Sequence, residues 1–251
     1  MKDKLAWFFL AGAASAGGYW IVRRLGTRRG ANDQEVHASL PGDALIPHPM
    51  VETTHAISIQ APPSLVWKWL IQAGYPGSGR AGWYSDSWLD AVTEGLFLRF
   101  TVPGEYMTDR LGLRSANQIL PEYQHTQVGD IVPDGPPGSA YFVVKAVESE
   151  HAWVLYSDTH IKYMTPLFLH GTPLEAHGEF TWAFVLHSLE EDGTRLILRT
   201  RARYDPAWIG KLMLPLFYLG EAILPLLILR GMKARTEEMA AAGSAVFSSA
   251  S

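Results

Sequence analysis

Apolar and polar residues alternate with a period of two in the second half of the chain, which predicts β-strands. The clearest pair covers 178–189 and 194–204, and Asp192-Gly193 between them is typical of a hairpin turn. On the first arm, one face holds the apolar residues Phe180, Trp182, Phe184 and Leu186. On the second arm, Leu196, Leu198, Thr200, Ala202 and Tyr204 share a face, and the other face holds Arg195, Arg199, Arg201 and Arg203. We therefore expect an antiparallel sheet with one covered face and one solvated face, the latter carrying the arginines.

A shift of one residue in strand register would reverse this assignment. The arginines would then line a cavity and bind an anionic head group. We keep this alternative open at the level of the sequence.

The same pattern predicts further strands over 53–59, 128–132, 141–147 and 153–158. A short helix is expected over 64–73, behind Pro62-Pro63, and another over 83–92. The glycine-rich stretch 74–82 reads as a loop and matches no phosphate-binding motif.

One long helix is expected over 206–240, with kinks at Pro215 and Pro225. Its part 208–229 is apolar nearly all round, with only Lys211 and Glu221 charged. Such a helix is either buried against the sheet or in contact with a membrane.

Residues 5–22 form an uncharged run of 18 residues. As a helix this run is roughly 27 Å long, enough for a thin hydrocarbon core. Trp7 lies near one end, Tyr19 and Trp20 lie near the other, and four arginines follow. We expect a retained, single-pass membrane anchor. The alternatives are a signal peptide cleaved near residues 14–16 and a soluble apolar helix.

The expected organisation has four parts. Residues 1–29 are the membrane anchor with its basic flank, and 30–50 are a linker in which Asn32 or Asp33 caps one helical turn. Residues 51–240 are one α+β domain, and 241–251 are a disordered tail. The arginines outnumber the lysines that precede the apolar run, so the body is expected in the cytoplasm. Cleavage of a signal peptide would instead give a secreted protein.

Composition narrows the function classes. The chain has 251 residues, of which 47% are hydrophobic, and it has no cysteine, which excludes disulfides and thiol chemistry. Residues 1–30 hold six basic residues and one acid, whereas the rest holds 15 basic and 24 acidic residues. An acidic body argues against nucleic acid as a partner, and a short basic stretch beside an apolar run points to a membrane. The histidine spacings match no metal motif, and we expect no cofactor and no metal.

Several local motifs resemble the helix-grip fold of the START/Bet v 1-like superfamily, also called SRPBCC. They are 61–67 (APPSLVW), 82–85 (GWYS) with Trp88-Leu89, 119–122 (ILPE), and 128–130 (VGD). They are similar to bacterial membrane-anchored members of its polyketide cyclase/dehydrase-like group. The resemblance implies an antiparallel sheet wrapped around a long C-terminal helix, with an apolar cavity between them. Residues 95–111 and 160–177 depart from the pattern, so the ligand type is not carried over.

The sequence places many large aromatic residues, with a few polar residues among them, on one small sheet and in the segment 83–88. Such a set is typical of a ligand pocket and also of an ordinary core. The predicted binding residues are Trp83, Tyr84, Ser85, Trp88, Trp153, Trp182, Phe184, Thr200 and Tyr204. Our leading hypothesis is a membrane-tethered protein that binds a hydrophobic small molecule or lipid.

Two alternatives remain. The first is a cyclase- or hydrolase-type enzyme acting on an apolar, polyketide-like substrate in the same cavity. It needs a buried ionisable residue, with Asp86, Glu122 and His125 as candidates. The second is a structural membrane protein that uses both apolar helices as spans.

Overall fold

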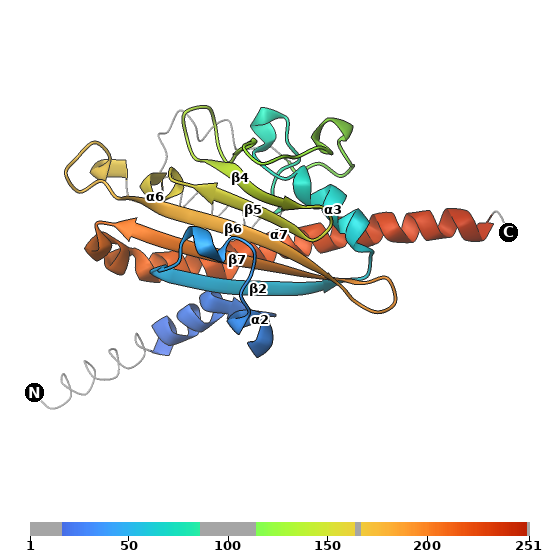
Figure 1. The fold of residues 1–251 in the computed structure, drawn as a ribbon, viewed down its shortest axis with the longest axis horizontal. Coiled ribbons are helices and arrows are strands. Elements are labelled where there is room, and N and C mark those ends of the chain that lie inside the picture. The colour runs from blue at the N-terminus through green and yellow to red at the C-terminus, as the bar shows by residue number, and fades with distance from the viewer. Residues whose placement is uncertain (1–16, 86–113, 164–166, 250–251) are drawn as a thin grey trace, which may run out of the picture.

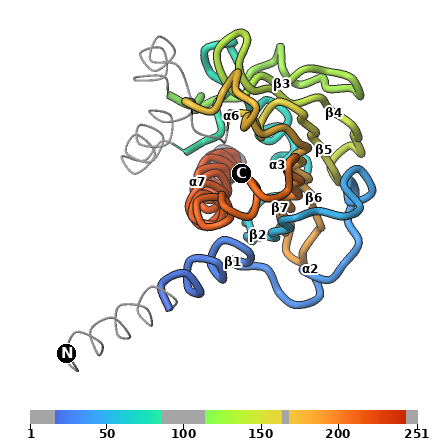
Figure 2. Tube along the Cα trace, turned by 90° about the vertical axis from the view of Figure 1, so that its left-hand side faces the viewer, coloured from blue at the N-terminus to red at the C-terminus, as the bar shows by residue number. Residues whose placement is uncertain are grey.

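A seven-stranded sheet lies along one side of a long C-terminal helix in this computed structural model, which describes residues 17–85, 114–163 and 167–249 (Figure 1). Figure 2 looks almost along the helix and shows the sheet curving around it. The strand order is β1-β2-β7-β6-β5-β4-β3, and every neighbouring pair is antiparallel except β1 with β2. The α+β prediction of a sheet that grips a C-terminal helix is confirmed at this level.

The strands are β1 (Arg28–Arg29), β2 (Val51–Ile59), β3 (Ile131–Pro133), β4 (Tyr141–Glu148), β5 (Ala152–Ser157), β6 (His177–Ser188) and β7 (Thr194–Asp205). The helices are α2 (Asp33–His37), α3 (Pro63–Ile71), α6 (His160–Tyr163) and α7 (Ala207–Ser249). Short 3-10 turns cover Asp43–Leu45, Pro76–Ser78, Pro121–Tyr123 and Leu167–Leu169.

Most expected elements are present within a few residues of their predicted ends. The helix expected over 83–92 is wrong in its first part, because residues 83–85 have no helical conformation. Tyr84 instead has a positive φ of 64°, which a continuous right-handed helix does not accept. The rest of that expected helix lies outside the described residues.

The inner face of the sheet, which packs on α7, carries the apolar side of the hairpin. Trp182 lies opposite Thr200, and Thr200 lies opposite Thr53 on the next strand. The core cluster joins these strands to α3 and to the buried side of α7. The predicted register of the hairpin is therefore confirmed, and the arginines point to the outer face.

The outer face is not the solvated surface that the sequence predicted. The segment 31–46, expected to be a linker, packs on it, with Ala31 and Leu40 buried against Ala56, Val185 and Ile197. Asn32 closes a capping box with Glu35 at the start of α2. The expected linker is thus a covering layer of the domain.

Three outer-face arginines hold this layer. Arg201 donates to the backbone carbonyls of Asp43 and Ile46. Arg199 is buried and donates to the backbone carbonyls of Glu35, Val36 and Ala38 and to Asp43. Arg195 pairs with Glu35 at 2.7 Å. The prediction of a solvated arginine face is wrong for Arg195, Arg199 and Arg201, because these guanidinium groups supply the donors that a short irregular segment needs for its carbonyls. Arg203 on the same face is exposed.

Helix α7 is continuous through Pro215 and Pro225 and continues to Ser249, into the segment expected to be a disordered tail. One side of it packs on β2, β7 and α3. Within the part of the chain described here, Ala207–Gly243 is the one stretch with the length and composition of a membrane span, and 44% of its most apolar window is buried. A core helix gives the same signal.

The predicted anchor over 5–22 lies mostly outside the described residues. Residues 17–27 are helical and project from the body (Figure 1). The C-terminal end of this helix is fixed to α7: a Cβ at Gly26 would lie 2.3 Å from the carbonyl oxygen of Tyr218, and Arg29 donates to Ala222. The chain then enters the sheet as β1.

Candidate ligand site on the inner face of the sheet

An aromatic cluster covers the inner face of β4, β5 and β6 and receives Trp83 from the loop after α3. The ring centres of Trp83 and Trp182 lie 5.0 Å apart, edge to face, and those of Trp83 and Phe184 lie 6.5 Å apart, stacked. Phe142 lies 5.2 Å from Trp182, and Trp153 lies 6.1 Å from Phe184. Phe142, Trp153, Trp182 and Phe184 are buried, so the cluster forms a large apolar part of the core on the inner face of the sheet.

Polar atoms without partners lie beside this cluster. Trp182 Nε1, Thr200 Oγ1 and His55 Nδ1 are buried and have no hydrogen-bond partner among the described residues. Each such atom costs about 1–3 kcal/mol when it is left unpaired. Trp182 and Thr200 are cross-strand neighbours, and His55 lies on the same face of β2. This concentration on three adjacent strands marks a place where a bound molecule with an oxygen atom would gain hydrogen bonds.

A buried carboxylate lies next to these atoms. Glu221 on α7 is 6% exposed and accepts a hydrogen bond from Thr53 Oγ1 at 2.5 Å. His55 Nε2 lies 3.6 Å from the same carboxylate oxygen and 3.1 Å from the carbonyl oxygen of Gly26. Burial raises the pKa of Tyr204, and the charge of Glu221 raises that pKa further. Glu221 therefore places a buried carboxyl group, negatively charged when ionised, on the β2–β7 side of the inner face.

A chain of hydrogen bonds runs along the other end of the cluster. Trp83 Nε1 donates to Asp134 Oδ1 at 2.6 Å, and the other oxygen of Asp134 lies 2.9 Å from His160 Nε2. His160 Nδ1 lies 2.6 Å from Ser157 Oγ. The ring of His160 stacks on Phe180 at 5.2 Å.

Serine, histidine and aspartate in this order are the residue types of a nucleophile, its base and an orienting acid. However, Ser157 is 1% exposed, and its Oγ already accepts from the backbone N–H groups of Thr159 and His160 at the start of α6. A hydroxyl engaged in this way is a helix cap. We assign the chain of hydrogen bonds to holding Trp83 against the sheet.

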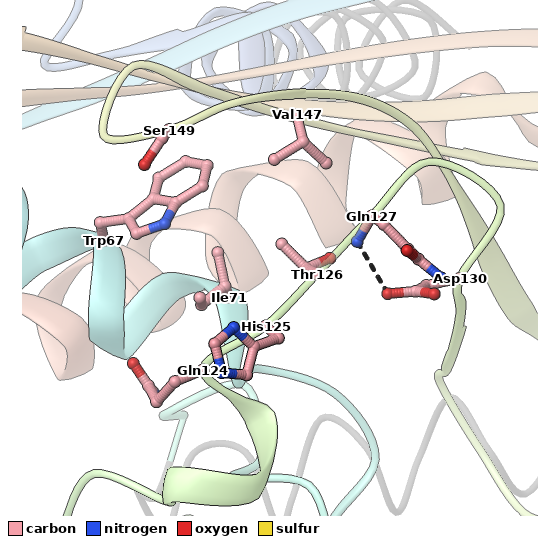
Figure 3. A pocket seen from close by; sticks show the side chains of 9 residues that line it. All are labelled: Trp67, Ile71, Gln124, His125, Thr126, Gln127, Asp130, Val147 and Ser149. Carbon is pink, nitrogen blue, oxygen red and sulfur yellow. Dashed lines mark hydrogen bonds between the residues drawn. The ribbon is translucent and has the colours of Figure 1, made fainter.

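Two hollows lie elsewhere. The first, about 620 Å³, lies on the outside between α3, residues 124–130 and the β4–β5 turn (Figure 3). Trp67, Ile71 and Val147 form its apolar part. The second, about 410 Å³, is lined by residues from Gly138 to His177 near α6. Neither is lined by any of the predicted binding residues.

The structure brings most of the predicted binding residues together and separates others. Trp83, Trp153, Trp182 and Phe184 form the aromatic cluster, and Thr200 lies beside it. Tyr204 lies farther along β7 against Phe217 of α7.

Three predicted residues do not join this group. Tyr84 donates from its hydroxyl to the carbonyl oxygen of Trp69 at 2.5 Å, and its ring lies edge to face with Trp69, so it is a core residue between α3 and α7. Ser85 is half-buried, and within residues 17–85, 114–163 and 167–249 no ring contact or hydrogen bond joins it to the cluster. Trp88 lies outside the described residues.

The candidate catalytic residues are not supported as a group. Glu122 and His125 are exposed, and His125 lines the outer hollow. Asp86 lies outside the described residues. Among these residues, the two that the structure describes therefore lack the buried position that acid–base work on an apolar substrate requires.

Sequence reasoning missed Glu221, His55 and the Asp134–His160 pair as members of the interior. Glu221 carried one signal, since it is the sole acid in an apolar helical stretch. His55 carried another, since it shares a strand face with Ile57 and Ile59. Neither signal alone showed that Glu221 on the helix contacts His55 on the strand.

No protein-family model matches the chain, and no curated protein matches its sequence. Solved structures do match. A hypothetical protein from Helicobacter pylori is 11% identical, with 79% of this chain and 95% of the other covered and a TM-score of 0.43. Protein MLL2253 from Mesorhizobium loti is 13% identical over 74% and 97%, with a TM-score of 0.39. Truncated norcoclaurine synthase from Thalictrum flavum is 13% identical over 70% and 92%, with a TM-score of 0.32. At these scores the matches decide nothing about function.

Proposed function

We propose that the chain binds a hydrophobic small molecule between the inner face of the sheet and α7. The observation that carries the proposal is the pair Trp182 Nε1 and Thr200 Oγ1, buried, unpartnered among the described residues and set opposite each other beside an aromatic cluster. Apolar walls with a few convergent polar groups are what small-molecule sites usually have.

The polar end of this molecule is uncharged. Thr200 lies opposite Thr53, and Thr53 donates to the carboxylate of Glu221. A carboxylate or phosphate bound at Thr200 would stand near this buried negative charge, where repulsion is weakly screened. A hydroxyl or carbonyl oxygen accepts from Trp182 Nε1–H without that cost. The geometry therefore favours an alcohol or ketone over a fatty acid.

The proposal includes a membrane tether formed by residues 5–22, with the body on the cytoplasmic side. Its support is the uncharged run of 18 residues followed by Arg23, Arg24, Arg28 and Arg29. The packing of α7 on β2 and β7 argues against a structural protein with two spans, because a helix held by a sheet is not free to insert. Alkaline extraction of membranes with protease protection tests the tether and its orientation.

Binding is tested on full-length protein in detergent by native mass spectrometry and organic extraction. We expect a discrete apolar compound, or uptake of added retinol or cholesterol in preference to palmitic acid. Thr200→Val removes one polar group with little change in shape, and Trp182→Phe removes the other together with part of the indole ring. We expect each variant to lose about tenfold in affinity for the probe, as for one lost hydrogen bond of about 1.4 kcal/mol.

Trp69→Phe is the matched control, since Trp69 Nε1 is also buried without a partner among the described residues but belongs to α3. An empty protein that takes up none of the three probes contradicts the proposal. Equal occupancy in the wild type and both site variants contradicts this placement of the ligand.

A further inference from the structure

The first half of α7 leaves one apolar face uncovered. Trp208, Leu212, Leu216 and Leu219 are 53%, 70%, 40% and 45% exposed. Their spacing of four, four and three residues places them on one side of the helix. Large apolar side chains gathered in one exposed row on a soluble domain mark an interaction surface.

This exposed face is separate from the core contact of the same helix. Ile209, Phe217 and Tyr218 are buried, and the core cluster includes them. Between residues 207 and 229 the charged residues are Lys211, which is exposed, and Glu221, which is buried. Folding of the domain thus accounts for one side of α7 and leaves the other side unexplained.

The helix at 17–27 continues the apolar surface. Its Tyr19, Trp20, Ile21 and Leu25 are 39%, 58%, 54% and 39% exposed. Its end is fixed at Tyr218, which precedes Leu219 of the exposed row. Helix 17–27 and the start of α7 lie at the same end of the molecule (Figure 1). Phe168, in the 3-10 turn Leu167–Leu169 that follows α6, is another exposed apolar side chain, 77% exposed.

We infer that this surface docks on a lipid bilayer that contains anionic lipids, an inference that rests on the proposed tether. In the sequence, the apolar residues 5–16, which lie outside the described part, directly precede helix 17–27. A bilayer that contained residues 5–16 would therefore lie next to Trp20 and, beyond it, next to the exposed face of α7. Arg23, Arg24 and Lys211 are exposed beside the apolar residues. Apolar side chains with basic neighbours and a tryptophan at the edge are what an interfacial helix presents to lipid.

The test uses the full chain in vesicles of phosphatidylcholine and phosphatidylglycerol. The natural sequence has no cysteine, so a single introduced cysteine carries the environment-sensitive fluorophore NBD. Leu212→Cys and Leu216→Cys report on the exposed row. Ala242→Cys is the matched control, because Ala242 is exposed on the other half of the same helix.

We expect NBD emission at 212 and 216 to move to shorter wavelength, and quenching by doxyl lipids to be at least about twice that at 242. Quenching that falls in vesicles of phosphatidylcholine alone supports the role of the basic residues. Water-like emission at 212 and 216 in protein that floats with the vesicles overturns the docking surface and leaves the tether intact.

Two other outcomes also overturn the inference. If the protein does not float with the vesicles, both the proposed tether and the docking surface are contradicted. A wavelength shift that depends on protein concentration and is insensitive to doxyl lipids assigns the surface to contact between copies of this chain. Retinol occupancy, measured on the same samples, reports separately on the proposed ligand site.

Discussion

Arg199 on β7 and Asp43 form a buried ion pair of 2.9 Å across the outer face of the sheet. The same guanidinium group donates to three backbone carbonyls of the covering segment. The pair therefore holds a segment that has little regular secondary structure of its own.

Replacing Arg199 by methionine is expected to lower the free energy of unfolding by about 3–5 kcal/mol. The change leaves the three carbonyls without their donor and removes one of the two arginines that pair with Asp43. Chemical denaturation followed by tryptophan fluorescence measures this loss. Arg203→Met is the control on the same strand, since Arg203 is 58% exposed in its pair with Glu179, and it is expected to cost about 0–1 kcal/mol. Equal losses in the two variants would contradict the role assigned to Arg199.

The pair of Glu35 and Arg195 gives stability that depends on pH. The hydrogen bond from Arg195 lowers the pKa of Glu35 below its ordinary value of 4.5. A lowered pKa in the folded state stabilises the protein above the unfolded pKa, and this contribution is lost as pH falls through and below that value. Glu35→Gln keeps the capping box and removes the charge.

We expect Glu35→Gln to be less stable than the wild type at pH 7 by about 1 kcal/mol. The difference should shrink when the pH falls below about 4. Denaturation midpoints measured across this range test the prediction. A difference that stays constant from pH 7 to pH 3 would show that the charge of Glu35 contributes nothing.

Gly231 marks the closest approach of α7 to the loop that holds Tyr84. A Cβ at Gly231 would lie 1.7 Å from the carbonyl oxygen of Tyr84. Gly231→Ala is expected to destabilise the protein by about 1–3 kcal/mol or more, since the backbone must move. Gly220→Ala lies on the same helix with nothing within 4 Å, and it is expected to stabilise by about 0.5–1 kcal/mol. Thermal unfolding of the two variants gives opposite shifts if this packing is correct.

Asp134 joins Trp83 to His160, and its loss should be felt in the aromatic cluster. Asp134→Ala leaves the Trp83 Nε1–H and the His160 ring without their acceptor, and we expect a loss of about 2–4 kcal/mol for two unpaired groups. Asp130→Ala is the control, since Asp130 accepts from the exposed backbone N–H of Gln127. Denaturation curves and near-ultraviolet circular dichroism measure both variants. If the near-ultraviolet circular dichroism of Asp134→Ala equals that of the wild type, the hydrogen bond to Asp134 does not hold Trp83 in the aromatic cluster.

The sequence was most informative where local periodicity decides the structure. The period of two fixed the hairpin and its faces, because a slip of one residue would have exposed Phe180, Trp182 and Phe184 together. The apolar composition around 208–229 likewise predicted a helix that is buried on at least one side. These features depend on neighbours along the chain.

The errors arose where distant segments meet. Alternation assigned Arg199 to the outer face correctly, but it could not show that residues 31–46 return to cover that face. Helical spacing placed Glu221 on α7, but its partners Thr53 and His55 lie about 170 residues earlier. The sequence therefore predicted the aromatic residues of the candidate site, but it did not predict the buried Glu221 and its contacts.

The entry of the chain into the sheet also has a mechanical consequence. Arg28 and Arg29 pair in parallel with Thr54 and His55 on β2, so a pull along the helix at 17–27 loads the β1–β2 hydrogen bonds before it reaches the core. Behind them, the contacts of Arg195 and Arg199 share the load over the outer face. A force applied at the N-terminus would therefore reach the edge of the sheet and the covering segment before it reaches the aromatic cluster.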